Sequence, residues 1–172
     1  MIRSALGRGL MVMATLRLAT PVAAQALPDW VAADSAGRQV MFTLVADAGP
    51  EPGTGTINGY RAGAVGLTVP QGWAVHWSWR NADTTQNHSL VIMAEREKLP
   101  AEGGQPAIDD ALSRMVKVGL KPGQKDEATF IAEPGGWYWM LCGVPGHALK
   151  GEWIGFRVDP GMTFVEVRSG VR

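Results

Sequence analysis

Turn-forming residues recur at short intervals along most of the chain, and this punctuation limits the possible folds more than any other feature. The sequence has 22 Gly and 11 Pro among its 172 residues, and the apolar runs between them are short. Such segments read as strands that end at turns, and they argue against a helical bundle. The pattern predicts an all-β protein.

About eight segments have the length and patterning of strands. The alternation is clearest over 73–80, where Val75, Trp77 and Trp79 point to one face and polar residues point to the other. The other expected strands are 40–45, 63–69, 88–93, 128–132, 137–142, 153–158 and 164–167. This number of short strands indicates a two-sheet Greek-key β-sandwich. One short helix is expected over 107–116, where apolar residues have helical spacing.

The first 26 residues have the features of a secretory signal peptide. Arg3 and Arg8 give a basic start, residues 9–16 are apolar, and Ala24-Gln25-Ala26 has the small-x-small cleavage pattern. The apolar stretch is shorter than the ~20 residues that a spanning helix needs, which argues against a membrane anchor. We therefore expect a periplasmic or extracellular protein whose residues 27–172 form one domain.

Charge argues against two classes of partner. The full chain has 16 basic and 16 acidic residues, and loss of Arg3, Arg8 and Arg17 with the signal leaves 13 and 16, a net charge of −3. No cluster of Lys and Arg remains in the expected mature chain. Binding to nucleic acid or directly to an anionic membrane is therefore not expected.

Cys142 is the only cysteine, so the chain has no internal disulfide. A free thiol outside the cytoplasm needs burial, a partner chain or a metal ion to protect it. Cys142 stands at the end of an apolar expected strand, and His147 follows five residues later, across a loop that contains Pro145 and Gly146. His88 begins a separate expected strand and offers a second imidazole.

One thiolate and two imidazoles form the donor set of a blue-copper site. The thiolate suits Cu(I) and also bonds covalently to Cu(II), and imidazole suits both oxidation states. His88, Cys142 and His147 are thus the predicted ligands of one copper ion that cycles between Cu(I) and Cu(II). Asn87 and Ser89 flank His88 and are expected either to brace the ligand loop by hydrogen bonds or to be ordinary polar residues at a strand start.

The segment CGVPGHA at 142–148 resembles the ligand loop of the sulfocyanins, which are blue copper proteins of the cupredoxin class, and it has the spacing of rusticyanin. The flanking WYW at 137–139 and GEW at 151–153 fit the same resemblance, as do VPQGW at 69–73, NHSLV at 87–91 and LKPG at 120–123. The resemblance spans residues 54–158. It implies a cupredoxin fold, a single copper ion and electron transfer.

One position departs from this resemblance. Sulfocyanin-like proteins carry an axial Met five residues after the second His, and this chain has Glu152 there. As a ligand, its carboxylate would favour Cu(II) and leave a costly buried negative charge in the reduced site. This interpretation predicts a low reduction potential with a slope of about 59 mV per pH unit. In the alternative, Glu152 points to the surface, and the axial position is empty or filled by a backbone carbonyl.

The leading functional hypothesis is a one-electron carrier rather than an enzyme, because the sequence offers no nucleophile–base pair. Val144, Pro145, Ala148 and Leu149 surround His147 and are expected either to form a docking patch for exported redox proteins such as cytochromes or copper oxidases or to be covered by the chain itself. Contact with a membrane is expected only through such partners. Two alternatives remain: a copper-binding or copper-delivery protein without a redox cycle, and a redox-inactive zinc-binding module, because Cys, two His and a carboxylate also satisfy tetrahedral zinc.

Overall fold

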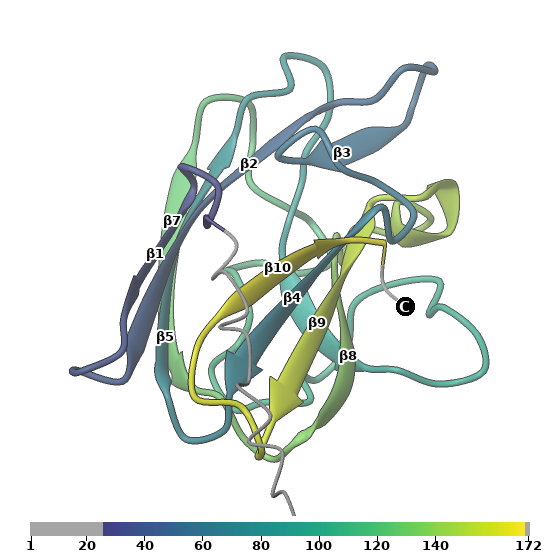
Figure 1. Ribbon diagram of the computed structural model, residues 1–172. Helices are drawn as coiled ribbons and strands as arrows, with labels where there is room; N and C mark the ends of the chain where they lie inside the picture. Colours follow the sequence, from purple (N-terminus) through teal and green to yellow (C-terminus); the bar gives the residue numbers. More distant parts are fainter. Residues whose placement is uncertain (1–25, 171–172) are drawn as a thin grey trace, which may run out of the picture.

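A computed structural model of the protein describes residues 26–170. These residues form two β-sheets packed face to face (Figure 1), which confirms the predicted all-β sandwich. The predicted signal peptide lies outside the described residues, apart from its last residue, Ala26. Within residues 26–170, no helix has the length and apolar character needed to cross a membrane.

Both sheets are mixed. In the first sheet the order is β1-β2-β5-β7, with β3 also paired to β2; its strands are β1 (Val31–Asp34), β2 (Gln39–Ala48), β3 (Gly55–Ile57), β5 (Ala74–Asn81) and β7 (Lys125–Ile131). In the second sheet the order is β10-β4-β9-β8-β6; its strands are β4 (Val65–Pro70), β6 (Val91–Ala94), β8 (Gly136–Leu141), β9 (Trp153–Asp159) and β10 (Glu166–Ser169). The pairs β2–β5 and β4–β9 are parallel, and the other pairs are antiparallel.

The core fills the space between the sheets, as the alternation of side chains along the strands requires. In β5 the predicted inward residues Val75, Trp77 and Trp79 are buried. The opposing sheet contributes large apolar side chains to the same cluster, among them Leu67, Val69, Tyr138, Met140, Ile154, Phe156 and Val158. Trp77 packs edge-on against Phe130 of β7, with ring centroids 5.2 Å apart.

The helix expected over 107–116 is not formed, so this prediction is wrong. Residues of this segment instead make backbone hydrogen bonds to β6 and the residues just before it: Ala107 N–H to Ile92 O at 2.8 Å, Ile92 N–H to Ala111 O at 3.0 Å, and Ser113 N–H to Leu90 O at 2.7 Å. Strand β6 lies at the edge of its sheet, and an edge strand has backbone groups that need partners. The segment satisfies them through bends, turns and one isolated bridge from Leu112 to Val91.

The apolar residues whose spacing predicted this helix lie in three different environments. Ile108 joins the main core, Leu112 packs on a second cluster, and Met115 is exposed. The second cluster lies on the outer face of the second sheet and is built on Val91, Trp139, Leu141 and Ala148. The connection between β6 and β7 covers it with Leu99, Leu112 and Val116. This connection therefore acts as an outer layer over β6 and β8.

Candidate metal centre

Three neighbouring strands of the second sheet bring three of the predicted ligands together. Strand β8 is antiparallel to both β6 and β9, and Leu141 is opposite Val91 on one side and Trp153 on the other. Cys142, which follows β8, therefore lies beside Glu152, which precedes β9. Its backbone N–H donates to Glu152 O at 3.0 Å. His88 stands three residues before β6, so it lies at the same end of these strands as Cys142 and Glu152.

His147 comes from the loop between β8 and β9. A 3-10 turn, η1 (Ala148–Lys150), follows it directly, and Gly151 ends this turn at a φ of 101°, where a residue with a Cβ would be strained. The Glu152 N–H donates to His147 O at 3.1 Å, so the loop closes on itself. His88 is fixed by a two-way backbone bridge to Leu120, with N···O distances of 3.2 and 2.7 Å.

The four predicted ligands meet in one cluster. One donor atom from each of His88, Cys142, His147 and Glu152 lies within 4.8 Å of every other. The His88 Nδ1 lies 2.7 and 2.9 Å from the two Glu152 carboxylate oxygens, and the His147 Nδ1 lies 3.1 Å from Oε2. The Cys142 Sγ lies 3.6 Å from the His147 Nδ1. His88, Cys142 and Glu152 are fully buried, whereas the His147 side chain is 11% exposed.

Glu152 points into the cluster, so the alternative in which it points to the surface is wrong. Gly55 of β3 makes room for its carboxylate: a Cβ at position 55 would lie 2.6 Å from the Glu152 Cδ and 2.8 Å from the His88 Cε1. Real Cβ atoms do not come so close to other atoms, so a larger residue would force the carboxylate or the imidazole to move. Sequence reasoning missed Gly55, because it stands in a segment that reads as an ordinary turn-rich loop.

Burial and charge make the cluster unfavourable for a thiolate without a cation. Burial raises the pKa of the Cys142 thiol, and the neighbouring Glu152 carboxylate raises this pKa further. Burial alone would lower the pKa of His88, but the Glu152 and Asp83 carboxylates outweigh it, and the pKa lies above its ordinary value. A metal ion would supply the positive charge that a buried thiolate and carboxylate need.

Two further residues organise the site. Ser89 Oγ donates to Val116 O at 2.6 Å and accepts from the Gly143 N–H at 2.9 Å, while the Ser89 N–H points at the Cys142 Sγ, 3.4 Å away. The predicted brace at Ser89 is thus present. Asp83 is a buried carboxylate 3.1 Å from the His88 Nε2. Sequence reasoning missed Asp83 because it lies in a polar turn; its position five residues before a predicted ligand was the available signal.

The residues around His147 form part of the expected patch. Pro145 and Leu149 are exposed and Val144 is half-buried, but Ala148 is buried in the second cluster and does not belong to the surface. His76 stands apart from the metal cluster on the outer face of β5, where its Nδ1 lies 2.9 Å from Thr129 Oγ1.

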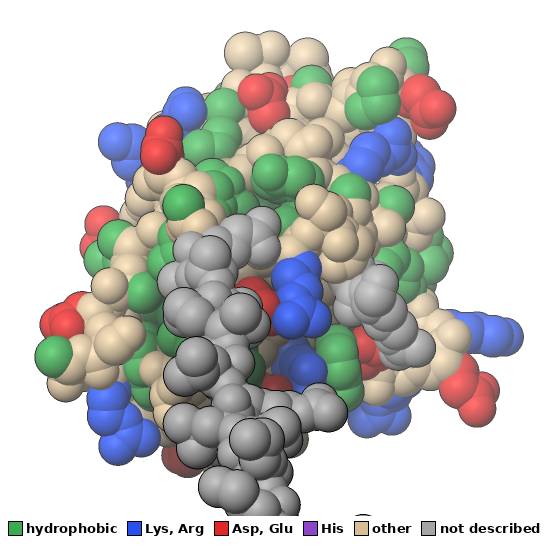
Figure 2. All heavy atoms as spheres, viewed as in Figure 1, with side chains coloured by type: hydrophobic (Ala, Val, Ile, Leu, Met, Phe, Trp, Pro, Cys, Tyr) green, Lys and Arg blue, Asp and Glu red, His purple; other side chains and the backbone are tan. Residues whose placement is uncertain are grey.

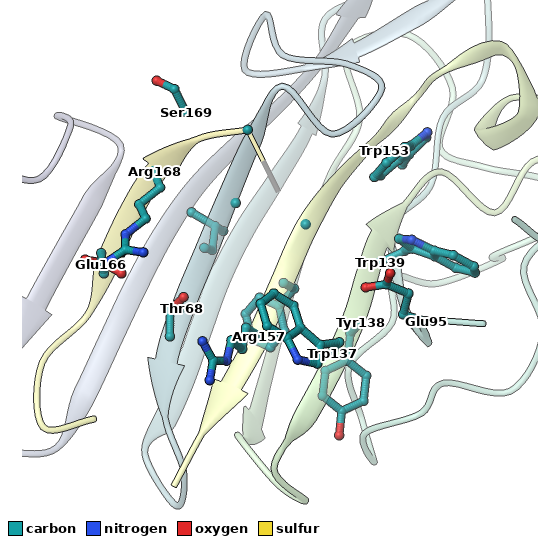
Figure 3. A pocket seen from close by; sticks show the side chains of 15 residues that line it. Thr68, Glu95, Trp137, Tyr138, Trp139, Trp153, Arg157, Glu166, Arg168 and Ser169 are labelled. Atoms are coloured by element: carbon teal, nitrogen blue, oxygen red, sulfur yellow. Dashed lines mark ion pairs between the residues drawn. The ribbon is translucent and has the colours of Figure 1, made fainter. Parts of the chain in front are cut away.

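A separate hollow of about 130 Å³ lies on the outer face of the second sheet (Figure 3). Gly66 of β4 and Gly155 of β9 are paired and leave a gap, because neither has a side chain. Trp139 is opposite Gly155, and Arg168 is opposite Gly66. Arg157 at its rim stacks on the Trp137 ring at 4.5 Å from the centroid. Arg157 and Arg168 are also ion-paired, to Asp159 and Glu166. The metal-ligating cluster is not part of this hollow.

The donor set fits copper, because a thiol sulfur and two imidazole nitrogens converge in a buried space and these donors suit both Cu(I) and Cu(II). The same set with a carboxylate also satisfies zinc. A two-sheet sandwich with Cys, two His and a fourth donor gathered by the loops around β6, β8 and β9 defines a cupredoxin.

The comparisons with known proteins agree with this class. A family model described as the sulfocyanin (SoxE) domain matches residues 29–165, and the chain therefore belongs to the sulfocyanin family. The family and the donor set together identify one copper ion as the cofactor. No curated protein matches the chain.

Several solved structures are similar to this chain. A reduced rusticyanin is 22% identical over 72% of this chain and 85% of its own, with a TM-score of 0.47. Rusticyanin from Thiobacillus ferrooxidans is 24% identical over 76% of this chain and 87% of its own, with a TM-score of 0.45. A multicopper oxidase is 23% identical over 75% of this chain and has a TM-score of 0.51, but this chain spans 45% of its length. At 23% identity, the likeness to the multicopper oxidase is one of fold alone.

Proposed function

We propose that the protein carries single electrons between exported redox proteins through a copper ion held by His88, Cys142 and His147, with Glu152 as a fourth ligand. The observation that carries this proposal is the buried convergence of these four side chains, from which His147 alone reaches the surface. Copper supplies the one-electron couple Cu(I)/Cu(II) when bound. The predicted signal peptide supports a periplasmic or extracellular location.

The protein's own contribution is to hold the donors still. His88, Cys142 and Glu152 are attached to adjacent strands, and their backbone groups are bonded to Leu120, to each other and to His147. Ser89 ties the Cys142 loop to the connection that covers β6. Rigid ligands favour electron transfer, because little has to rearrange when the charge of the site changes by one.

We infer that electrons enter and leave at the exposed edge of His147. Pro145 and Leu149 stand on either side of His147 in the sequence, and both are exposed. We call Pro145 and Leu149 the docking patch. Exposed apolar residues of this kind favour a partner that docks briefly and excludes water.

Basic side chains stand near the docking patch. Lys150 belongs to η1, Arg61 donates to Lys150 O at 2.6 Å, and Lys117 pairs with Glu102. Over the face seen in Figure 2, basic and acidic side chains are interspersed. A redox partner with acidic groups around an apolar centre, such as a cytochrome or a copper oxidase, would complement this arrangement.

The visible absorption spectrum of the copper-loaded protein tests the proposal. We expect an intense thiolate-to-Cu(II) band that disappears with one electron equivalent of reductant and returns on oxidation. A colourless protein that retains zinc in preference to copper would instead support the zinc-binding alternative. Rapid loss of copper to an acceptor, with no stable oxidised form, would support copper delivery. Either of these two results would overturn the electron-carrier proposal.

A further inference from the structure

A second buried carboxylate holds His88 from the side opposite Glu152. Asp83 lies in the turn between β5 and β6 and is 1% exposed, and its Oδ2 is 3.1 Å from the His88 Nε2. The other ring nitrogen, Nδ1, is 2.7 Å from Glu152 Oε1. The His88 imidazole is therefore engaged at both nitrogens by buried carboxylates.

Asp83 is itself held in a fixed orientation. Its Oδ1 accepts hydrogen bonds from the Thr85 N–H and hydroxyl, both at 2.7 Å, and from the Gln86 N–H at 3.2 Å. Its backbone N–H donates to Asn81 Oδ1 at 3.0 Å. These bonds fix the carboxylate so that its Oδ2 faces His88.

The chemistry of imidazole gives this contact a consequence. A neutral imidazole carries one proton, and the nitrogen that lacks the proton is the one that can bind a metal ion. In the cluster, the His88 Nδ1 faces the other donors and Nε2 faces Asp83. When a metal ion takes the place of the proton at Nδ1, the acceptor at Nε2 keeps the remaining proton there and leaves the Nδ1 lone pair for the metal.

We propose that Asp83 is a positioning residue of the copper site, which selects the His88 tautomer that binds metal through Nδ1 and biases the site toward Cu(II) by its negative charge. This inference rests on the proposed function. It assigns different tasks to the two imidazoles: His88 is the anchored ligand, and His147, with its exposed edge, is the contact with the partner.

Asp83→Asn separates this role from a purely structural one. The amide oxygen can still accept the bonds from Thr85 and Gln86 that shape the turn, but the group facing the His88 Nε2 becomes an NH2 donor. Asp34→Asn is the matched control, because Asp34 Oδ1 also accepts the N–H of a turn residue, Gly37 at 2.9 Å, and it lies on β1, outside the cluster. Both substitutions remove one negative charge.

The experiment measures Cu(II) affinity by chelator competition, the reduction potential by voltammetry and the visible band. For Asp83→Asn we expect a 10- to 100-fold loss of Cu(II) affinity, a higher reduction potential and a shifted band, with Asp34→Asn unchanged in all three. Affinity within twofold of wild type, together with an unchanged potential, would overturn the proposal.

A measurement on the unmodified protein covers the case in which Asp83→Asn does not fold. In the Zn(II)-loaded protein, which is diamagnetic, 15N NMR of the imidazoles reports which nitrogen carries the proton. We expect the His88 Nε2 to carry a proton that exchanges slowly with water. A proton on Nδ1, or fast exchange at Nε2, would overturn the role of Asp83. Because zinc does not cycle, this result is independent of whether the protein carries electrons.

Discussion

At the scale of single residues, Glu152 distinguishes this chain from the sulfocyanin pattern of an axial Met. Its carboxylate lies between the two Nδ1 atoms and is fully buried. A carboxylate is a hard, anionic donor, and it stabilises Cu(II) more than Cu(I). We therefore expect Glu152 to make this site a weaker oxidant than one with Met in the same place.

Glu152→Met should raise the reduction potential. The substitution replaces an anionic oxygen donor with a neutral thioether, which suits Cu(I). We expect a rise of at least about 59 mV, which is a tenfold shift in the one-electron equilibrium. Voltammetry of the copper-loaded variant checks this, and a potential equal to or below that of the wild type would show that Glu152 does not act on the metal.

Gly55→Ala should disturb the site without altering a ligand. The added methyl overlaps the Glu152 carboxylate and the His88 ring, and overpacking of this kind costs about 1–3 kcal/mol. We expect a lower free energy of unfolding in urea and a shifted thiolate-to-Cu(II) band. Gly104→Ala is the control, because its added Cβ would have Met93 as a neighbour at an ordinary 3.7 Å. Equal behaviour of the two variants would contradict the account.

The residues of the site were predictable to different degrees. Cys142 and His147 share one short loop, and their residue types alone indicate metal binding. The prediction of His88 as a ligand also required the prediction that a separate strand begins at this residue. Asp83 follows β5, and Gly55 begins β3. Both strands belong to the other sheet, so the approach of these two residues to the cluster depends on how the two sheets pack. No local pattern reports that packing.

At the scale of elements, the connection between β6 and β7 has a structural role that its polar sequence does not predict. It pairs with the edge of β6, covers Trp139 and Leu141, and presents Leu120 to the backbone of His88. Helical spacing of Ile108, Leu112 and Met115 predicted a helix, but these residues serve two clusters and the surface. Unpaired backbone groups at a sheet edge outweighed a weak periodicity.

Ser89→Ala should loosen this connection from the ligand loop. It leaves the Gly143 N–H and the Val116 carbonyl without the hydroxyl, and an unsatisfied buried group costs about 1–3 kcal/mol. Urea unfolding of the metal-free protein measures the loss. Ser78→Ala, on the outer face of β5, is the matched control and should cost less than about 0.5 kcal/mol. Equal losses in both variants would count against a bracing role.

At the scale of the whole molecule, the sandwich provides a rigid frame with one accessible ligand. The strand order β9-β8-β6 brings the segment around His88 beside the consecutive strands β8 and β9, which carry the other three ligands. Turn punctuation and alternation predicted most of these strands, but not β1 or β3. Strand β3 is three residues long and begins in a segment rich in Gly and Pro that reads as a loop, although it pairs with β2 as the second arm of an antiparallel hairpin.

Electron exchange should depend on the docking patch. Self-exchange between oxidised and reduced copies requires no identified partner and is measured by NMR line broadening. Leu149→Lys places a like charge at the proposed contact, and we expect self-exchange to slow by about tenfold with the visible band unchanged. Phe164→Lys is the control, since Phe164 is similarly exposed, 51% against 59%, but lies just before β10. If self-exchange were slower in Phe164→Lys and unchanged in Leu149→Lys, the docking site would not be at Leu149.

The proposed electron transfer requires one copper ion at the point where the segments that carry His88, Cys142 and His147 meet. Anomalous diffraction at the copper edge, from crystals of the copper-loaded protein, locates that ion directly. We predict a single strong peak bonded to the Nδ1 atoms of His88 and His147 and to the Sγ of Cys142. A peak elsewhere on the molecule, or imidazoles turned away from the sulfur in the loaded protein, would contradict the account.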